Sequence, residues 1–351
     1  MRLIAPFTAT LDHEEVLVRR GTRSGLFSVV AVHSTVLGPA LGGCRMWHYD
    51  DARAALRDAL RLSRAMTFKS AVAGLPLGGG KGVIMLDGRQ PPPSRKAVLL
   101  DFADTVEALG GHYITAEDVG TSAKDMQVIS EATSHVTGLS RRRGGSGDPS
   151  PFTALGVRAA IGACCERVFG TASLKGRTVC VSGLGHVGMR LARDLMRAGA
   201  RVLATDIDPA KRAEATAAGA RWIASGKALG AAVDVFAPCA LGGVLDQETV
   251  PLLQAPVVAG AANNQLADDA VAGLLRARDI LWAPDFVANA GGIINIAVEL
   301  EPAGYDPARA RARVGELGDT LRGIFAAADT AGTSPLDAAM ELARRRLAAA
   351  A

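Results

Sequence analysis

Two lysines draw attention because lysine is scarce in this sequence. The chain has 351 residues and 39 basic ones, of which only seven are lysine. Lys69 ends a stretch of helical periodicity in AMTFKSAVAG, and Lys81 follows three glycines in PLGGGKGVI. A lysine on a glycine-rich turn against an apolar strand is partly desolvated, and desolvation favours the neutral amine that a general base needs. Either lysine alone could also be a surface side chain whose aliphatic stem packs on apolar neighbours.

Further polar residues stand where strands are expected to end. Asp118, in ITAEDVGTS, follows an expected strand and precedes an expected helix. It is therefore either a catalytic carboxylate or a helix cap, and Glu117 shares the second possibility. All four asparagines of the chain, among them Asn263, Asn264 and Asn289, are expected on or near strand ends. Ligands bind at the carboxyl ends of parallel strands, which favours a ligand-orienting role over a role in turns.

The sharpest local motif is a glycine hexapeptide made of Gly183, Leu184, Gly185, His186, Val187 and Gly188. It follows the apolar stretch RTVCVS and opens a helical stretch, as in dinucleotide-binding folds. There the glycines allow a tight turn, close approach of a pyrophosphate and close helix–strand packing. Asp206 ends the next expected strand, about 20 residues on, where an acid holds the ribose hydroxyls. Its charge would repel the extra phosphate of NADP, so we expect NAD as the cofactor.

The elements that must position these residues form two different patterns. Before residue 140, expected strands (26–34 and 112–115) mix with expected helices (51–66, 94–109 and 122–133). After residue 150, a helix (153–169) precedes six short apolar strands at 177–182, 201–205, 220–223, 233–237, 256–260 and 279–283. Connecting stretches separate these strands, which predicts a parallel sheet covered on both faces. Two helices, 306–328 and 335–349, are expected to end the chain.

These patterns predict an α/β protein of two domains. The stretch GLSRRRGGSGDPSP, rich in Gly, Pro, Ser and Arg, marks the boundary. We expect an N-terminal α/β domain at 1–140, which contains Lys69, Lys81 and Asp118. A Rossmann-type, doubly wound parallel sheet should occupy 150–328 and bind NAD. A C-terminal helix at 329–351 is expected to return to the first domain.

Composition excludes several classes of protein. The formal net charge is only +4, well below what a nucleic-acid-binding protein would show. No apolar run approaches 18 residues, and the first residues turn acidic too early for a signal peptide, so no membrane partner is expected. The five cysteines are scattered and form no CxxC pair, which argues against a zinc site or a disulfide framework. We therefore expect no bound metal and a cytoplasmic protein.

Together, the motifs resemble the glutamate/leucine/phenylalanine/valine dehydrogenase family. The matching segments follow the family's order and spacing: LGPALGGCRM, RAMTFK, PLGGGKGVI, TAEDVGT, PSPFTALGV, GLGHVG, TDID, PCALGG, GAANNQL and APDFVANAGGIIN. The short chain is most similar to the leucine, valine and phenylalanine branch. The resemblance implies reversible, NAD-dependent oxidative deamination of an L-amino acid to a 2-oxo acid and ammonia, by a homo-oligomer. It also implies that the N-terminal domain at 1–140 binds the substrate and forms the oligomer.

The resemblance also implies a role for each matching residue. Lys81 would be the general base or acid for the water that attacks the imino acid, and Asp118 would assist proton transfer. Lys69 and the backbone at Gly42 would hold the substrate carboxylate. The other implied substrate contacts are Met66, Leu41, Ala116, Asn264, Asn289, Ile293 and Ile296. The implied cofactor contacts are the hexapeptide, Asp206, Thr153, Ala240 and Asn263, with the roles of Asn263 and Asn264 interchangeable at this stage.

The implied substrate pocket is apolar, so leucine, valine or isoleucine is the expected substrate. Glutamate is disfavoured because its side-chain carboxylate would be buried without a partner. Phenylalanine or another aromatic amino acid remains an alternative within the family. Outside it, the alternatives are a hydroxy-acid dehydrogenase, which would need a catalytic His or Arg, and a non-enzymatic NAD-binding module, which need not keep Lys81 and Asp118.

Overall fold

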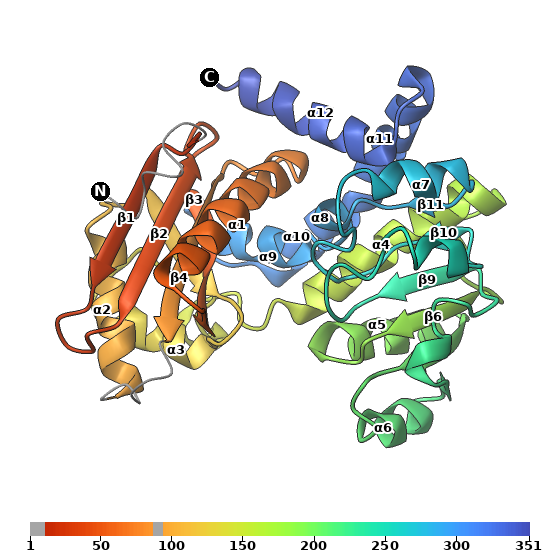
Figure 1. Ribbon diagram of the computed structural model, residues 1–351, viewed down its shortest axis with the longest axis horizontal. Helices are drawn as coiled ribbons and strands as arrows, with labels where there is room; N and C mark the ends of the chain where they lie inside the picture. Colours follow the sequence, from red (N-terminus) through yellow and green to blue (C-terminus); the bar gives the residue numbers. More distant parts are fainter. Residues whose placement is uncertain (1–10, 87–93) are drawn as a thin grey trace. The chain divides into compact units, whose positions relative to one another are not determined.

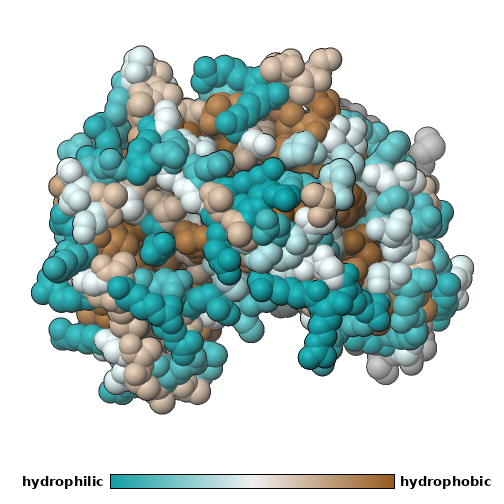
Figure 2. Space-filling view, turned by 180° about the vertical axis from the view of Figure 1, so that it is seen from behind, coloured by the Kyte–Doolittle hydropathy of each residue, from teal (hydrophilic) through white to brown (hydrophobic). Residues whose placement is uncertain are grey.

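The computed structural model describes residues 11–86 and 94–351 (Figure 1). Part of the N-terminal segment used in the signal-peptide argument lies outside these residues. The chain forms two compact units, which confirms the expected two-domain α/β fold. The first unit runs to Asp148 and also takes Ile296–Asp306 and Ala343–Ala351, whereas the second takes Pro149–Asn295 and Pro307–Leu342. On the face drawn in Figure 2, hydrophilic residues are interspersed with smaller apolar areas, as on ordinary globular surfaces.

The first unit is built on a five-stranded sheet of order β1-β2-β4-β3-β5. Its strands are β1 (Glu15–Arg20), β2 (Phe27–Ser34), β3 (Ala40–His48), β4 (Gly78–Leu86) and β5 (Tyr113–Glu117). Strand β2 runs antiparallel to both β1 and β4, whereas β3 runs parallel to β4 and β5. The helices are α1 (Ala52–Val72), α2 (Arg95–Glu107) and α3 (Ala123–Ile129).

Side-chain alternation along the strands assigns one sheet face to each helical layer. On β2, Val29 and Ala31 pack with Leu56 of α1, while the intervening Val30 packs with Phe102 of α2. Successive side chains of a strand point to opposite faces, so both faces of this sheet are covered. Helix α1 starts at its cap Asp51, whose Oδ1 accepts the N–H of Ala54 at 2.7 Å.

The end of α1 is held by the C-terminal helix α12 (Pro335–Ala348), whose last residues belong to the first unit. The Arg346 Nη1 donates to the carbonyl oxygens of Ala71 and Val72, at 2.8 and 2.7 Å. The last carbonyls of a helix lack intrahelical donors and carry partial negative charge, so the guanidinium stabilises this terminus. Lys69 lies in that last turn.

The placement of Lys81 on a glycine-rich turn is wrong. Lys81 lies inside β4, because the flanking Gly80 and Gly82 continue the strand. A Cβ at Gly80 would meet the ring of Tyr113, and one at Gly82 would meet the ring of Phe102. These glycines therefore let two large aromatic side chains pack close to the strand. The strands β1 and β3 were not anticipated from the sequence; β3 contains two glycines, which are depleted in strands and conceal the pattern.

The second unit contains a six-stranded sheet of order β11-β10-β9-β6-β7-β8, with every neighbouring pair parallel. The strands are β6 (Thr178–Ser182), β7 (Arg201–Thr205), β8 (Arg221–Trp222), β9 (Val235–Pro238), β10 (Val257–Val258) and β11 (Leu281–Trp282). The helices are α4 (Ser150–Phe169), α5 (His186–Arg197), α6 (Lys211–Ala217), α7 (Val271–Ala277), α8 (Asp285–Ala288), α10 (Pro307–Gly315) and α11 (Leu317–Ala331). Helix α9 (Gly291–Glu299) begins in this unit, and its residues from Ile296 on belong to the first. The expected six-stranded parallel sheet is thus confirmed.

Two details of the second half differ from the sequence-based expectation. The single helix expected at 306–328 is two helices, α10 and α11, which meet at Gly315 and Glu316. Glycine is a poor helix former because it loses the most backbone freedom, which accounts for a break at this point. The expectation that all four asparagines fall on or near strand ends is also wrong, since Asn295 lies inside α9 and Asn289 caps the end of α8.

The packing of β4 predicts the effect of adding a single methyl group. Gly82→Ala should destabilise the protein by about 1–3 kcal/mol, because the new Cβ would overlap the Phe102 ring. The matched control is Gly323→Ala on α11, where a Cβ meets no atom within 4 Å and alanine should stabilise the helix by up to about 1 kcal/mol. Urea unfolding at fixed protein concentration measures both. Equal midpoints for the Gly82 variant and the parent would contradict the described packing.

Candidate active site

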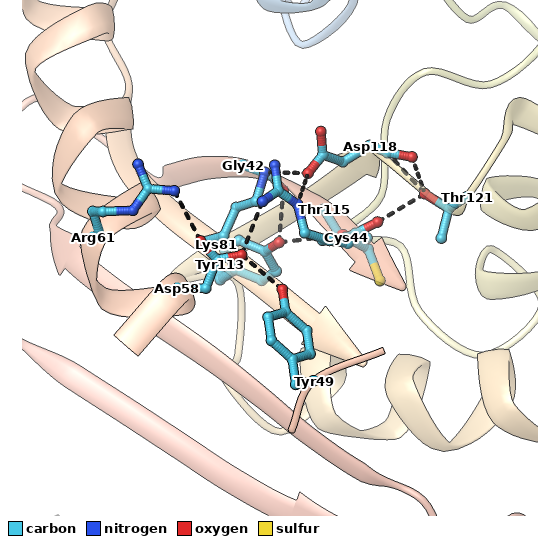
Figure 3. A network of polar contacts seen from close by, with 11 residues as sticks. Gly42, Cys44, Tyr49, Asp58, Arg61, Lys81, Tyr113, Thr115, Asp118 and Thr121 are labelled. Carbon is cyan, nitrogen blue, oxygen red and sulfur yellow. Dashed lines mark hydrogen bonds and ion pairs between the residues drawn. The ribbon is translucent and has the colours of Figure 1, made fainter. Parts of the chain in front are cut away.

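A buried ion pair joins Lys81 to Asp118 (Figure 3). Lys81 stands in the middle of the sheet on β4, and Asp118 directly follows β5. The Lys81 Nζ lies 2.6 Å from the Asp118 Oδ2, and the two side chains are only 7% and 23% exposed. Strand alternation points Lys81 toward the α1 face, the face that Val83 shares. The structure therefore brings the two expected catalytic residues into direct contact.

The surroundings of Asp118 keep its carboxyl group ionised. Burial alone would raise its pKa, but the Lys81 ammonium and the Arg45 guanidinium outweigh burial and lower the pKa below 3.8. Its ionised form therefore stabilises the fold at neutral pH, and this contribution is lost as the pH falls through the lowered pKa. Both cations contact Oδ2, at 2.6 Å for Lys81 and 3.1 Å for Arg45. The second oxygen, Oδ1, can accept from a substrate amino group.

The other expected substrate residues of the first unit lie on the same sheet face or on α1. Leu41 on β3 is buried and pairs in register with Gly79, whose Cβ position points at Thr67 of α1. Ala116 on β5 is buried and pairs with Gly43 of β3. Met66 and Lys69, one turn apart on α1, are both half-buried.

The backbone at Gly42 is fixed from the opposite face of the sheet. The Tyr113 hydroxyl donates to the Gly42 carbonyl oxygen at 2.6 Å, inside the core. A Cβ at Gly42 would overlap the carbonyl of Gly80 on the neighbouring strand. Glycine at this position is therefore required by the close approach of β3 and β4, and any function of its backbone comes in addition to that.

In the second unit, the hexapeptide has the geometry expected for a dinucleotide-binding turn. Gly183 has φ of +103°, and its Cβ position lies 2.6 Å from the Cβ of Ala240. Gly188 faces the Gly183 carbonyl so closely that only glycine fits. At Gly185, by contrast, a Cβ would meet no protein atom within 4 Å. Neither packing nor φ demands glycine there, so its absent side chain fits close approach of a ligand to the backbone.

The rest of the hexapeptide connects this turn to Asp206. The buried Leu184 donates its N–H to the Asp206 Oδ2 at 2.6 Å, directly beyond β7. His186 and Val187 form the first turn of α5, where unpaired backbone N–H groups and the helix dipole attract a phosphate. The carboxylate of Asp206 keeps further acceptor capacity, because each oxygen carries two lone pairs.

The second unit also contains the asparagines and Thr153 that the sequence marked as candidate site residues. The Asn289 Nδ2 donates to the Asn263 Oδ1 at 2.9 Å, and the buried Asn289 Oδ1 has no hydrogen-bond partner among the described residues. Asn264 adopts φ of +51°. Thr153, in the first turn of α4, donates from Oγ1 to the Pro149 carbonyl at 3.2 Å. The buried Ile293 belongs to this unit, whereas the buried Ile296 belongs to the first.

Sequence reasoning missed three residues that surround the ion pair. Arg45 on β3 contacts Asp118, and Asp58 on α1 accepts from both Arg45 and Tyr49. An arginine within an otherwise apolar and glycine-rich strand, GGCRM, was the available signal, since a cation placed there needs an acidic partner. Over the described part of the chain, no three His, Cys, Asp or Glu side chains are grouped so that they could hold a metal. No helix among the same residues is long and apolar enough to cross a membrane.

A doubly wound parallel sheet with a dinucleotide-type turn, together with a separate unit that carries a buried Lys–Asp pair, defines a two-domain α/β enzyme of the dehydrogenase type. The family model for the Glu/Leu/Phe/Val dehydrogenase dimerisation domain matches residues 13–135. The Glutamate/Leucine/Phenylalanine/Valine dehydrogenase model matches 144–207 and 205–350. The chain belongs to this family, and the resemblance seen in the sequence is confirmed.

Individual relatives agree with this assignment. Leucine dehydrogenase from Geobacillus stearothermophilus is 43% identical over 342 residues, covering 97% of this chain and 92% of the relative. Valine dehydrogenase from Streptomyces virginiae is 44% identical over 339 residues, covering 95% and 94%. The crystal structure of L-tryptophan dehydrogenase from Nostoc punctiforme superimposes with a TM-score of 0.84, at 37% identity and 99% coverage of both chains. The chain is therefore an amino-acid dehydrogenase, a class of enzyme that generally uses a nicotinamide cofactor.

The different environments of two glycines in the hexapeptide give a matched pair of variants. Gly185→Ala should unfold within about 0.5 kcal/mol of the parent, because its methyl group meets no protein atom. It should nevertheless weaken NADH binding at least about tenfold, which corresponds to about 1.4 kcal/mol. Gly188→Ala should instead destabilise the fold, because its methyl group would overlap the Gly183 carbonyl. Urea unfolding and fluorescence titration with NADH measure the two effects. Unchanged NADH affinity in the Gly185 variant would contradict this account of the turn.

Proposed function

We propose that this enzyme oxidatively deaminates an apolar L-amino acid, leucine, valine or isoleucine, with NAD. In the balanced reaction, the amino acid, water and NAD⁺ give the 2-oxo acid, ammonium, NADH and a proton. The observation that carries the proposal is the Lys81–Asp118 ion pair, which lies on a sheet face shared with the apolar Leu41 and Ala116. A base next to a carboxylate and beside an apolar surface suits an amino acid whose side chain carries no charge.

The residues of the first unit divide the proton transfers between them. A bound nicotinamide cofactor would supply the acceptor for the hydride of the substrate Cα, so that an imino acid would form. Lys81, as the neutral amine, takes a proton from the water that attacks the imino carbon. Asp118, whose Oδ2 contacts both cations, receives or returns the proton of the amino nitrogen, so that ammonia leaves. The Lys81–Asp118 contact of 2.6 Å provides a direct route between the two groups.

The substrate carboxylate would be held by Lys69 and the backbone at Gly42. Lys69 lies in the last turn of α1, the turn that Arg346 stabilises, and its ammonium would form a charge-assisted hydrogen bond. Met66, one turn earlier on α1, would line the same site. Asn264 and Asn289 are the further proposed substrate-orienting residues; the buried Asn289 Oδ1 lacks a described partner and suits an amino-group donor.

The side chain of the substrate would contact Leu41, Ala116, Ile293 and Ile296. All four are buried and apolar, so a glutamate carboxylate would have no partner among them. An aromatic substrate is the second candidate. It is favoured by the similarity to the L-tryptophan dehydrogenase from Nostoc punctiforme.

The preference for NAD rests on Asp206 at the end of β7. Its carboxylate would accept the ribose hydroxyls and repel the 2′-phosphate of NADP. Thr153, Ala240 and Asn263 would complete the cofactor site. We further propose a homo-oligomer, since the family model matched by residues 13–135 is described as a dimerisation domain. A reducing cytoplasm fits the five cysteines, all of which are free thiols.

A substrate panel tests the proposed function directly. With NAD, leucine, valine or isoleucine should give the highest kcat/KM and glutamate a far lower one. Leucine and valine should differ by only about 10–200-fold, the value of one methylene in an apolar pocket. NAD should be preferred over NADP, and Asp206→Ser should narrow that preference. The absorbance of the NADH formed follows each reaction at fixed pH. A clear preference for phenylalanine or tryptophan would favour the second candidate, and equal use of both cofactors would refute the role of Asp206.

Variants at the two lysines separate catalysis from binding. Lys81→Ala should lower kcat by about 10²–10⁴-fold, the usual contribution of a general base, with NADH binding unchanged. The rise of the deamination rate with pH should also disappear in this variant. Lys69→Ala should mainly raise KM for the amino acid, by about 10–100-fold, because a charge-assisted hydrogen bond is worth about 1.5–3 kcal/mol. Steady-state kinetics from pH 6 to 11 measure both. A folded Lys81→Ala protein with full activity would refute the mechanism.

A further inference from the structure

A second cation contacts the same carboxylate oxygen as Lys81. Arg45 projects from β3 on the α1 face, and its Nε lies 3.1 Å from the Asp118 Oδ2. Its Nη1 lies 2.8 Å from the Oδ2 of Asp58, which stands on α1. The four side chains therefore alternate in charge in the order Lys81, Asp118, Arg45 and Asp58.

Asp58, the last of these four charged side chains, has further polar partners. Asp58 accepts a hydrogen bond from the Tyr49 hydroxyl at 2.6 Å and pairs with Arg61 at 2.9 Å (Figure 3). Burial would raise its pKa, but the Tyr49 hydrogen bond and Arg45 outweigh burial and lower it. Asp58 is therefore a permanent anion at neutral pH. Its side chain is 14% exposed and that of Arg45 is 22% exposed, so solvent screens their interaction incompletely.

These contacts matter when Lys81 gives up its proton. Asp118 would then be a buried anion that has lost one partner, a costly arrangement that would favour return of the proton to Lys81. Arg45 does not lose its proton at any working pH, so it still neutralises Asp118 in that state. Asp58 offsets part of the positive charge of Arg45. The two residues thus act on Lys81 in opposite directions.

We propose that Arg45 and Asp58 are positioning residues that set the pH at which Lys81 becomes a base, acting through the shared oxygen of Asp118. The proposal rests on the proposed function. In the deamination direction, Arg45 should shift the rising limb of the rate to lower pH and Asp58 should shift it to higher pH. Neither residue needs to touch the substrate.

Other titratable groups lie on the elements packed around Lys81. Cys44 on β3 and Tyr113 on β5 point to the opposite, α2 face of the sheet, and burial raises the pKa of each and keeps both neutral. His33 on β2 hydrogen-bonds Thr67 of α1, and burial lowers its pKa. Lys69 lies on α1. Substitutions at Arg45 and Asp58 retain all of these groups. The electrostatic influence of these groups on Lys81 is therefore the same in the parent and in the variants.

The pH dependence of kcat for leucine deamination tests the proposal. Arg45→Gln should move the rising limb up by about one pH unit, the effect of removing a unit charge a few ångströms away at partial burial. Asp58→Asn should move it down by about half a unit. Arg45→Lys keeps the charge and should leave the midpoint near that of the parent, even if kcat falls. The matched control is Arg322→Gln on α11, which removes an equal charge that pairs with Glu166 in the second unit and should shift nothing.

A second readout makes the outcome independent of the substrate. Trace acetylation across the pH range, quantified by mass spectrometry for the peptide that carries Lys81, reports deprotonation of this amine directly. NADH titration and thermal unfolding verify that each variant is folded. Two midpoints are compared, that of the kcat–pH profile and that of Lys81 acetylation. The proposal is overturned if both midpoints of Arg45→Gln equal those of Arg322→Gln, or if Asp58→Asn moves them to higher pH. If Arg45→Gln fails to fold, the direction of the Asp58→Asn shift decides. A parent without turnover on any apolar amino acid would refute the proposed function, and the acetylation midpoints would still test this inference.

Discussion

The contact of 2.6 Å between the Lys81 ammonium and the Asp118 carboxylate is the interaction on which the first unit depends. Removing two charges from water is costly, and an ion pair of this kind persists only where geometry and further polar partners compensate. Here the compensation comes from Arg45 on the neighbouring strand and, through it, from Asp58 on α1. The glycines of β4 allow the aromatic core to pack close beneath the strand that carries Lys81.

The proposed cofactor site of the second unit has different physical requirements from those of the ion pair. A dinucleotide presents phosphate charge, which backbone N–H groups at a helix start can bind without a buried side-chain cation. The constraint on the sequence is therefore steric. The turn and its packing require glycine at positions 183 and 188, whereas a Cβ at Gly185 would meet no protein atom within 4 Å, which leaves room for a ligand. Side chains carry the acid–base chemistry proposed for the first unit, whereas backbone geometry dominates the cofactor binding proposed for the second.

This contrast explains what could be predicted from the sequence. The turn at Gly183 is local, so the strand, the glycine spacing and Asp206 are visible within about 25 residues. The environment of Lys81 is not local. Its partner Asp118 follows β5, Asp118 also contacts Arg45 of β3, and Arg45 contacts Asp58 of α1. The glycines around Lys81 also resemble a turn rather than a strand. Periodicity identified most helices correctly but could not place the break at Gly315 between α10 and α11. The sequence shows Arg45 only as part of the segment GGCRM. Its role could not be predicted, because it depends on ion pairs with Asp58 and Asp118, which lie elsewhere in the sequence.

The most direct test of the ion pair as the catalytic centre is a double-mutant cycle on kcat for amino-acid deamination, with Lys81→Ala, Asp118→Ala and the double variant. If the two side chains act as one acid–base unit, removing the second after the first costs little, and the double variant should be about as active as Lys81→Ala alone. If instead the two losses multiply, the residues act independently, and the ion pair is not the unit that performs the proton transfers.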